Sequence, residues 1–368
     1  MTIAKQSDKK SYIYSLQLLR IIAAFFVMLF HINSIFVEKY NIHPILSYVN
    51  FGQSGVHIFF VLSGFVMYLM HRDDIGNGLK KANIFATKRF IRIYPTYWVL
   101  TSLVLVSMFL TSGEVKAYKY SFSYIFESYS LFHLGLMEGN PLIPAGWTLF
   151  HEVKFYSFFL LLIALKDIKI RNFVIWVALT ITVINIFIDT AAYPVFTFYF
   201  SSFNLLFAMG VVSGWITDHY ARQVGNLANV IFAIFAFAGV SVISNYLLWD
   251  TDPTSIIIFG IVSFLIITSL SCYEQTRQSS FRFSSTILML ANITYCLYLI
   301  HYPVYTIITI IDRKLNLPYS LVVIAMIFVS FVASIIYYKL IEEPLVNVLK
   351  RKLLKSKKNT IRTEVFTN

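Results

Sequence analysis

The sequence predicts an all-α integral membrane protein, a polytopic helical bundle with about ten transmembrane helices. The chain has 368 residues, of which 58% are hydrophobic and only 13% are charged. Its mean hydropathy is +0.69, and apolar stretches long enough to cross a bilayer recur from end to end. The 35 Phe and 24 Tyr residues suit lipid-facing and interfacial positions. These features leave no room for a soluble domain of ordinary size.

The apolar stretches define the expected transmembrane helices, since about 20 residues at about 1.5 Å each cross the hydrocarbon core. They lie at residues 16–36, 52–70, 93–112, 147–165, 172–190, 196–216, 229–248, 254–272, 286–311 and 319–340. We therefore expect a short N-terminal segment, residues 1–15, before a transmembrane domain, residues 16–345. The basic tail, residues 346–368, is expected to be a loose segment at the membrane surface.

The distribution of Lys and Arg between the short loops predicts the orientation. Basic clusters precede the first span and follow the second, fourth, sixth, eighth and tenth, whereas the alternate loops carry less charge. Both termini are therefore expected in the cytoplasm, with the protein in the inner (cytoplasmic) membrane of the cell. The net charge of +12 comes from these separate clusters and forms no continuous face, which argues against a nucleic-acid partner.

The first span carries two ionisable residues, Arg20 and His31, inside an otherwise apolar helix. They are eleven residues apart, close to three helical turns, and so share one face. Gln17 precedes Arg20 on that face and Ser34 follows His31. Because charged groups inside a membrane span are costly, this polar stripe marks a functional helix.

Three ionisable side chains lie at a similar predicted depth, about 22 Å from the cytoplasmic surface. They are His31 in the first span, Glu152 in the fourth and His301 in the ninth. We expect them to share one polar chamber in the outer half of the membrane. Each also has a structural interpretation, because an intramembrane His can bond between helices and a Glu near Trp147 can be an interfacial anchor.

Arg89 and Arg92 lie on one helical face in the segment KRFIRIYP, at the cytoplasmic mouth of the third span. Paired guanidinium groups suit a phosphate, so with Arg20 they could bind a phosphorylated ligand or a lipid headgroup. A positive-inside anchor without a ligand explains the spacing equally well. In the second span, Ser63 and Gly64 are expected to permit close approach of a neighbouring helix.

The remaining features are less specific. Cys272 and Cys296 both fall in apolar runs and are expected to be small buried hydrophobes, and we expect no metal site. The outward segment, residues 113–146, is long and rich in Tyr. A segment of that length is a lid, an acceptor-binding surface or a plain connector.

Six motifs occur in an order that resembles the membrane acyltransferase-3 family, which includes bacterial O-antigen and exopolysaccharide O-acetyltransferases. In chain order they are LQLLRIIAAFFVMLFH with Arg20 and His31, FFVLSGF, KRFIRIYP with Arg89 and Arg92, GWTLFHEVKFY with Glu152, YCLYLIHYPV with His301, and KLIEEPL with Glu342. The resemblance covers roughly residues 12–345.

This resemblance implies a ten-helix enzyme that takes an acetyl or other acyl group from cytoplasmic acetyl-CoA or another acyl-CoA and passes it to a saccharide hydroxyl. It implies that His31 is the catalytic base, that Glu152 is a further active-site residue, and that Arg89 and Arg92 bind the donor phosphates. Arg20 is expected either to contact the donor with them or to pair structurally with a neighbouring helix. His301, Trp147, Tyr298 and Glu342 are candidate substrate-binding or structural residues. This chain departs from the family pattern just before Glu152, where it has Phe150 and His151.

The expected reaction needs no covalent enzyme intermediate, because a neutral imidazole can remove the proton of the attacking hydroxyl. The alternative is a transporter or flippase for a glycan or lipid-linked sugar, which also uses intramembrane charge and basic mouths but needs no acyl donor. A polysaccharide polymerase is disfavoured, since its large Arg-rich external loop has no counterpart in residues 113–146.

Overall fold

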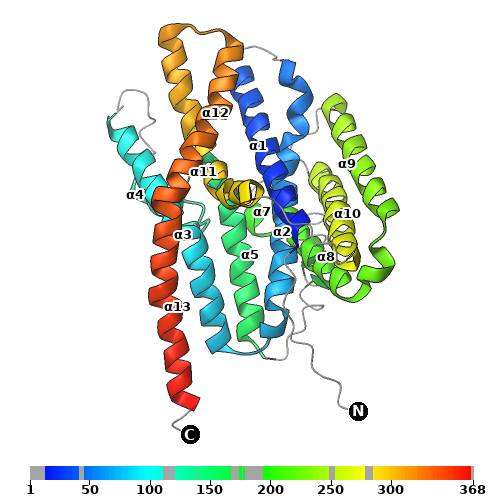
Figure 1. Ribbon diagram of the computed structural model, residues 1–368. Coiled ribbons are helices and arrows are strands. Elements are labelled where there is room, and N and C mark those ends of the chain that lie inside the picture. The colour runs from blue at the N-terminus through cyan, green and yellow to red at the C-terminus, as the bar shows by residue number, and fades with distance from the viewer. Residues whose placement is uncertain are drawn as a thin grey trace.

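The computed structural model is a bundle of long helices (Figure 1). It describes residues 13–40, 45–110, 121–137, 139–166, 174–175, 177–178, 194–247, 253–277 and 285–365. The long helices are α1 (Tyr14–Tyr40), α2 (Ser54–His71), α3 (Leu79–Leu110), α5 (Trp147–Ala164), α8 (Phe203–Val224), α9 (Leu227–Leu247), α10 (Pro253–Arg277), α11 (Ser285–Leu315), α12 (Tyr319–Tyr337) and α13 (Glu343–Val365). Short helices are α4 (Phe122–Ser130) and α7 (Pro194–Tyr199).

The all-α membrane architecture is confirmed. Within the described ranges there is no strand, and nine helical stretches are long and apolar enough to cross a membrane. Each of the nine overlaps one expected span. The remaining expected span, residues 172–190, lies mostly outside the described residues. The protein is therefore a multi-pass membrane protein.

The tightest helix crossing joins α2 to α8, and it depends on two glycines. A Cβ atom on Gly64 would clash with the backbone carbonyl of Phe207, and one on Gly210 would clash with that of Val61. The two backbones approach so closely because neither glycine has a side chain. The close approach expected at Gly64 is confirmed, and it fixes the position of α2 in the bundle.

Helix α1 packs against α2, α10 and α11, and both of its ends are anchored by buried carboxylates. The Glu274 side chain, from α10, accepts the backbone N–H groups of Tyr14 and Ser15 at 2.6 and 2.8 Å. These are among the first N–H groups of α1, which have no partner within their own helix. At the other end, the Tyr40 hydroxyl donates to Asp312 of α11 at 2.6 Å. The axial position of α1, which carries Arg20 and His31, is thereby fixed.

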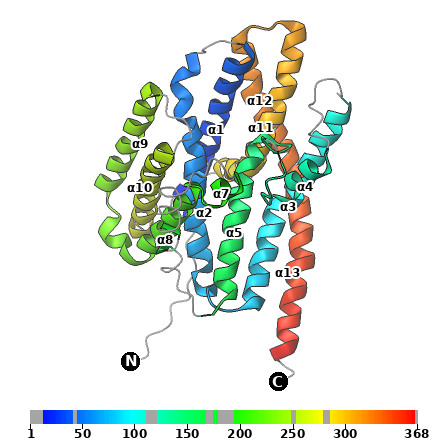
Figure 2. The same cartoon turned by 180° about the vertical axis from the view of Figure 1, so that it is seen from behind.

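The C-terminal segment is helical as far as the structure describes it, and its loose placement at the membrane surface remains a prediction. A π-helical turn, Tyr338–Glu342, joins α12 to α13, and helix continues to Val365. Figures 1 and 2 show α12 and α13 descending as one long rod, antiparallel to α1. The opposite directions of these first and last helices agree with termini on one side, and the cytoplasmic assignment of that side remains a prediction.

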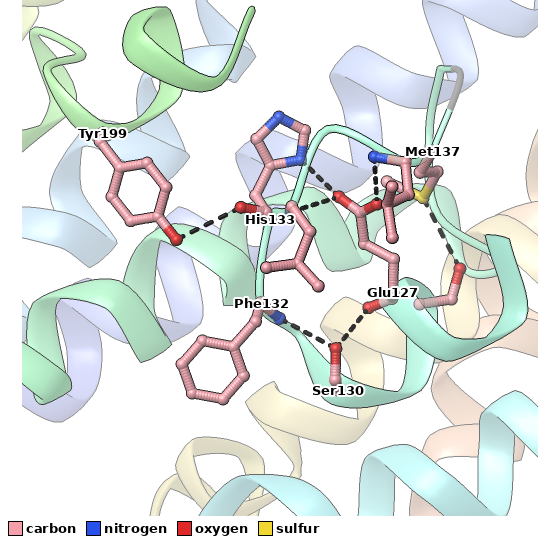
Figure 3. Close-up of polar contacts among 9 residues, drawn as sticks. Glu127, Ser130, Phe132, His133, Met137 and Tyr199 are labelled. Carbon is pink, nitrogen blue, oxygen red and sulfur yellow. Dashed lines mark hydrogen bonds and ion pairs between the residues drawn. The ribbon is translucent and has the colours of Figure 1, made fainter. Parts of the chain in front are cut away.

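The described part of residues 113–146 contains a folded cap, so it is more than a plain connector. Helix α4 lies within it, and its Glu127 is fully buried. The Glu127 carboxylate accepts from His133 Nδ1 at 2.7 Å and from the backbone N–H groups of Leu134 and Leu136 at 3.0 and 2.8 Å (Figure 3). The Tyr199 hydroxyl donates to the carbonyl of His133 at 3.2 Å. One carboxylate thus organises the chain that follows α4.

Candidate active site

A cavity of about 420 Å³ lies among α1, α2, α3, α5 and α11. Its apolar wall comes mainly from α2, with Val56 and Phe59 as examples. Its polar wall carries three arginines, one carboxylate and several hydroxyl groups: Arg20, Arg89, Arg92, Glu152, Ser63, Thr148, Tyr156, Thr294, Tyr295 and Tyr298. Three guanidinium groups face a single carboxylate, so the cavity favours an anionic ligand.

Arg89 is held by aromatic rings and by a histidine. Its guanidinium carbon lies 5.4 Å from the ring centre of Phe85 and 5.1 Å from that of Tyr156. Its Nη2 atom lies 3.1 Å from His71 Nε2. The Tyr156 hydroxyl in turn donates to the Glu152 carboxylate. Tyr156 thus contacts Arg89 through its ring and Glu152 through its hydroxyl.

The other two arginines reach the cavity from different helices. Arg92 of α3 lies over Tyr295, with 5.8 Å between the guanidinium carbon and the ring centre. Arg20 of α1 contacts Gln17 Oε1 at 3.4 Å. The structure therefore brings into one cavity three arginines that come from two separate spans.

Tyr298 forms the boundary between this cavity and a second polar group. Its hydroxyl lies 2.8 Å from Thr148 Oγ1, at the first turn of α5. Thr148 also donates to the carbonyl of Ala145 at 3.2 Å, which ties this boundary to the outward segment. One turn further along α11, the ring of His301 lies 5.9 Å from that of Tyr298.

His31 and His301 contact each other directly. His301 Nε2 lies 3.0 Å from His31 Nδ1, and His301 Nδ1 lies 3.0 Å from the carbonyl oxygen of Leu297. A carbonyl only accepts, so His301 carries its proton on Nδ1 and offers the Nε2 lone pair to His31. His31 Nδ1 therefore donates, which leaves the lone pair of a neutral His31 on Nε2.

The expectation of one chamber for His31, Glu152 and His301 needs correction. Depth along each helix placed the three residues at one level, and the two histidines do meet. Glu152, however, turns to Tyr156 and lines the arginine cavity, and neither histidine is among the residues that line it. Depth says nothing about rotation around the helix axis, and rotation separates Glu152 from the pair.

The remaining candidates lie outside these two groups. Trp147 packs edge-on against Phe60 and against His151, with ring centres 6.5 and 5.8 Å apart, in a structural position between α5 and α2. Glu342 is buried at the end of the π-helical turn and accepts from the thiol of Cys296 at 2.7 Å. Cys296 is thus buried, as expected, but it is also a hydrogen-bond donor to a carboxylate.

Four residues in or beside the cavity are not among those predicted from the sequence: Tyr156, Thr148, His71 and Asp74. Tyr156 lies four residues after Glu152 on one helical face, a spacing that could have identified it. The other three depend on contacts between helices, which no local pattern reveals. Among the described residues no group of three or more His, Cys, Asp or Glu side chains is placed to hold a metal ion.

Comparison with known proteins identifies the family. A family model described as an acyltransferase domain matches residues 13–339. The peptidoglycan O-acetyltransferase OatA of Listeria monocytogenes serovar 1/2a (strain ATCC BAA-679 / EGD-e) is 22% identical over an aligned region that covers 91% of this chain and 56% of OatA. The chain thus spans about half the length of this relative. No solved structure matches it. Because the family match extends over nearly the whole chain, the protein belongs to the acyltransferase-3 family of membrane acyltransferases.

Proposed function

We propose that this protein transfers an acetyl or other short acyl group from cytoplasmic acyl-CoA to a hydroxyl of a cell-surface or lipid-linked saccharide. The observation that carries the proposal is the pairing of a cavity lined by three arginines with two hydrogen-bonded histidines, which meet at Tyr298. Arginine recognises phosphate in a planar fork, and a neutral imidazole accepts a proton near neutral pH.

The arginine cavity would bind the donor. Arg89 and Arg92 would contact the phosphates of coenzyme A, with Arg20 deeper along α1. The thioester arm would then extend past Glu152 towards Tyr298, because Tyr298 lines the cavity and its ring lies 5.9 Å from that of His301. Glu152 carries the negative charge of the cavity wall and would hold the arm or the saccharide by hydrogen bonds.

The histidine pair would supply the base. His31 Nε2 removes the proton of the acceptor hydroxyl, and the hydroxyl oxygen attacks the thioester carbonyl carbon. The carbon–sulfur bond breaks, the new ester remains on the saccharide, and the thiolate of coenzyme A takes the proton from His31. His301 keeps His31 in the required tautomer throughout, because its Nε2 lone pair accepts from His31 Nδ1.

Purified protein in lipid nanodiscs with labelled acetyl-CoA tests the proposal. The wild type is expected to transfer or hydrolyse the acetyl group. The rate of this reaction is expected to be at least roughly 100-fold lower in His31→Ala. His57→Ala is the matched control, since His57 is also buried in a membrane helix but packs against Phe203 and Phe259. Full activity of His31→Ala would overturn the proposed role of His31. Movement of lipid-linked sugar across the bilayer without an acyl donor would favour the transporter alternative.

A further inference from the structure

A line of polar contacts leads from the end of α2 into the arginine cavity. His71, the last residue of α2, is buried, and its Nδ1 lies 3.0 Å from Asp74 Oδ2. Its Nε2 lies 3.1 Å from Arg89 Nη2. Asp74 is also paired with Lys81, 2.9 Å away. No step of the proposed reaction uses His71 or Asp74.

These contacts allow only one protonation state of His71. A guanidinium has donors and no acceptor, so His71 Nε2 must offer its lone pair to Arg89. The proton of the neutral ring then lies on Nδ1, where the carboxylate of Asp74 accepts it. The imidazole is thereby fixed in tautomer and in orientation, with its acceptor atom directed at Arg89.

The Arg89 side chain is fixed in two further ways. Its guanidinium lies beside the rings of Phe85 and Tyr156, at 5.4 and 5.1 Å from their centres. Its Nε–H group is buried and has no hydrogen-bond partner in the part of the chain that the structure describes. A buried donor of a charged group without an acceptor is costly unless a ligand supplies one. Arg89 is thus held by His71 and retains a donor for an anion.

We propose that His71, oriented by Asp74, is a positioning residue that fixes Arg89 to receive a phosphate oxygen of the acyl donor. This inference rests on the proposed function of the cavity. The acceptor atom of His71 fixes one edge of the guanidinium fork and leaves the rest of the fork for the ligand. Donor affinity therefore depends on His71, whereas the proton transfer at His31 does not.

Two substitutions at His71 separate its two hydrogen bonds. His71→Asn keeps an amide near the position of Nδ1, within reach of Asp74, but has no atom at the position of Nε2. His71→Gln places its amide oxygen near the position of Nε2 and keeps an acceptor for Arg89. We expect His71→Asn to raise the KM for acetyl-CoA roughly tenfold with kcat within about twofold of wild type. His71→Gln is expected to restore most of the affinity.

The neighbouring acids provide a second, milder test. Asp74→Asn weakens the hold on the His71 tautomer, and we expect the KM for acetyl-CoA to rise roughly threefold. Asp73→Asn is the matched control, since Asp73 is exposed and its carboxylate lies 3.7 Å from Arg72 Nε. If His71→Asn does not yield folded protein, judged by size-exclusion chromatography, the Asp74→Asn and Asp73→Asn pair decides the question.

Arg89→Ala distinguishes a failure of this inference from a failure of the proposed function. The variant is expected to raise the KM for acetyl-CoA, and adding His71→Asn to it is expected to change the KM no further, because both act through one guanidinium. If Arg89→Ala leaves the KM unchanged, the proposed donor site is wrong. If Arg89→Ala raises the KM while His71→Asn and Asp74→Asn match wild type, the role of His71 is wrong and the donor site stands.

Discussion

The arginine cavity and the histidine pair meet at Tyr298, yet they differ in charge. The cavity keeps three guanidinium groups against one carboxylate, and its best-held arginine has a neutral histidine and aromatic rings as neighbours. The pair of His31 and His301 is joined by one hydrogen bond between rings that are both neutral in the tautomers derived above. An excess of positive charge suits the binding of an anion, whereas a neutral pair suits the movement of one proton.

Substitutions in the two regions should therefore change different kinetic constants. Loss of a cavity arginine removes binding that is equal in the ground state and the transition state, so it raises KM for the donor. Loss of the hydrogen bond between the histidines acts on the chemical step and lowers kcat. A variant that changes both constants equally would break the distinction.

Among the variants that test this comparison, the largest effect is expected at His301. His301→Phe keeps a ring but removes the acceptor for His31 Nδ1, so His31 is no longer held in the reactive tautomer. We expect kcat to fall roughly 100-fold with an unchanged KM for acetyl-CoA, measured in steady-state transfer assays. His301→Gln keeps an acceptor oxygen and is expected to recover part of the loss. Equal kcat values for His301→Phe and wild type would show that the pair is only structural.

A smaller effect is expected at Arg92. Arg92→Gln removes one cation from the cavity, and we expect the KM for acetyl-CoA to rise roughly tenfold with little change in kcat. Arg222→Gln is the matched control, because Arg222 is an exposed arginine in the last turn of α8. A fall in kcat at constant KM would mean that Arg92 acts in the chemical step, and the proposed difference between the cavity and the histidine pair would be wrong.

Tyr298→Phe tests the boundary itself. The substitution removes the 2.8 Å contact with Thr148 Oγ1 but keeps the ring that lines the cavity. We expect kcat to fall roughly threefold, because the ring that separates donor and base loses one of its anchors. Thr148→Val should have a similar effect, and the double variant should be no worse than either single one. Additive losses would mean that the two hydroxyl groups act separately.

The smallest effect on activity is expected at Glu127, in the outward cap. Glu127→Gln weakens three hydrogen bonds to a fully buried carboxylate, so we expect a loss of about 2 kcal/mol in unfolding free energy. Thermal unfolding in detergent measures this loss, and kcat and KM are expected to stay within about twofold of wild type. A raised KM for acetyl-CoA would show that the cap reaches the donor site.

Much of the fold could be predicted from the sequence, because a membrane span is a local property of about 20 residues. Nine expected spans overlap described helices for this reason. The arrangement of the candidate site was harder to predict. The i, i+3 spacing of Arg89 and Arg92 placed them on one face, and depth placed His31 level with His301. The turn of Glu152 towards Tyr156 and the contact of His71 with Arg89 depend on helix rotation and packing, which the sequence pattern does not encode.

The carboxylate of Glu274 that holds the start of α1 has a consequence for substrate choice. Arg20 and His31 are separated by eleven residues of one unbroken helix, or about 16 Å along its axis. Because both ends of α1 are anchored, the distance between the proposed anion site and the proposed base is fixed. A donor whose acyl carbon stands too near its phosphates, or too far from them, would miss His31. Under the proposed function, the length of donor that fits is therefore set by a helix that Glu274 holds in place.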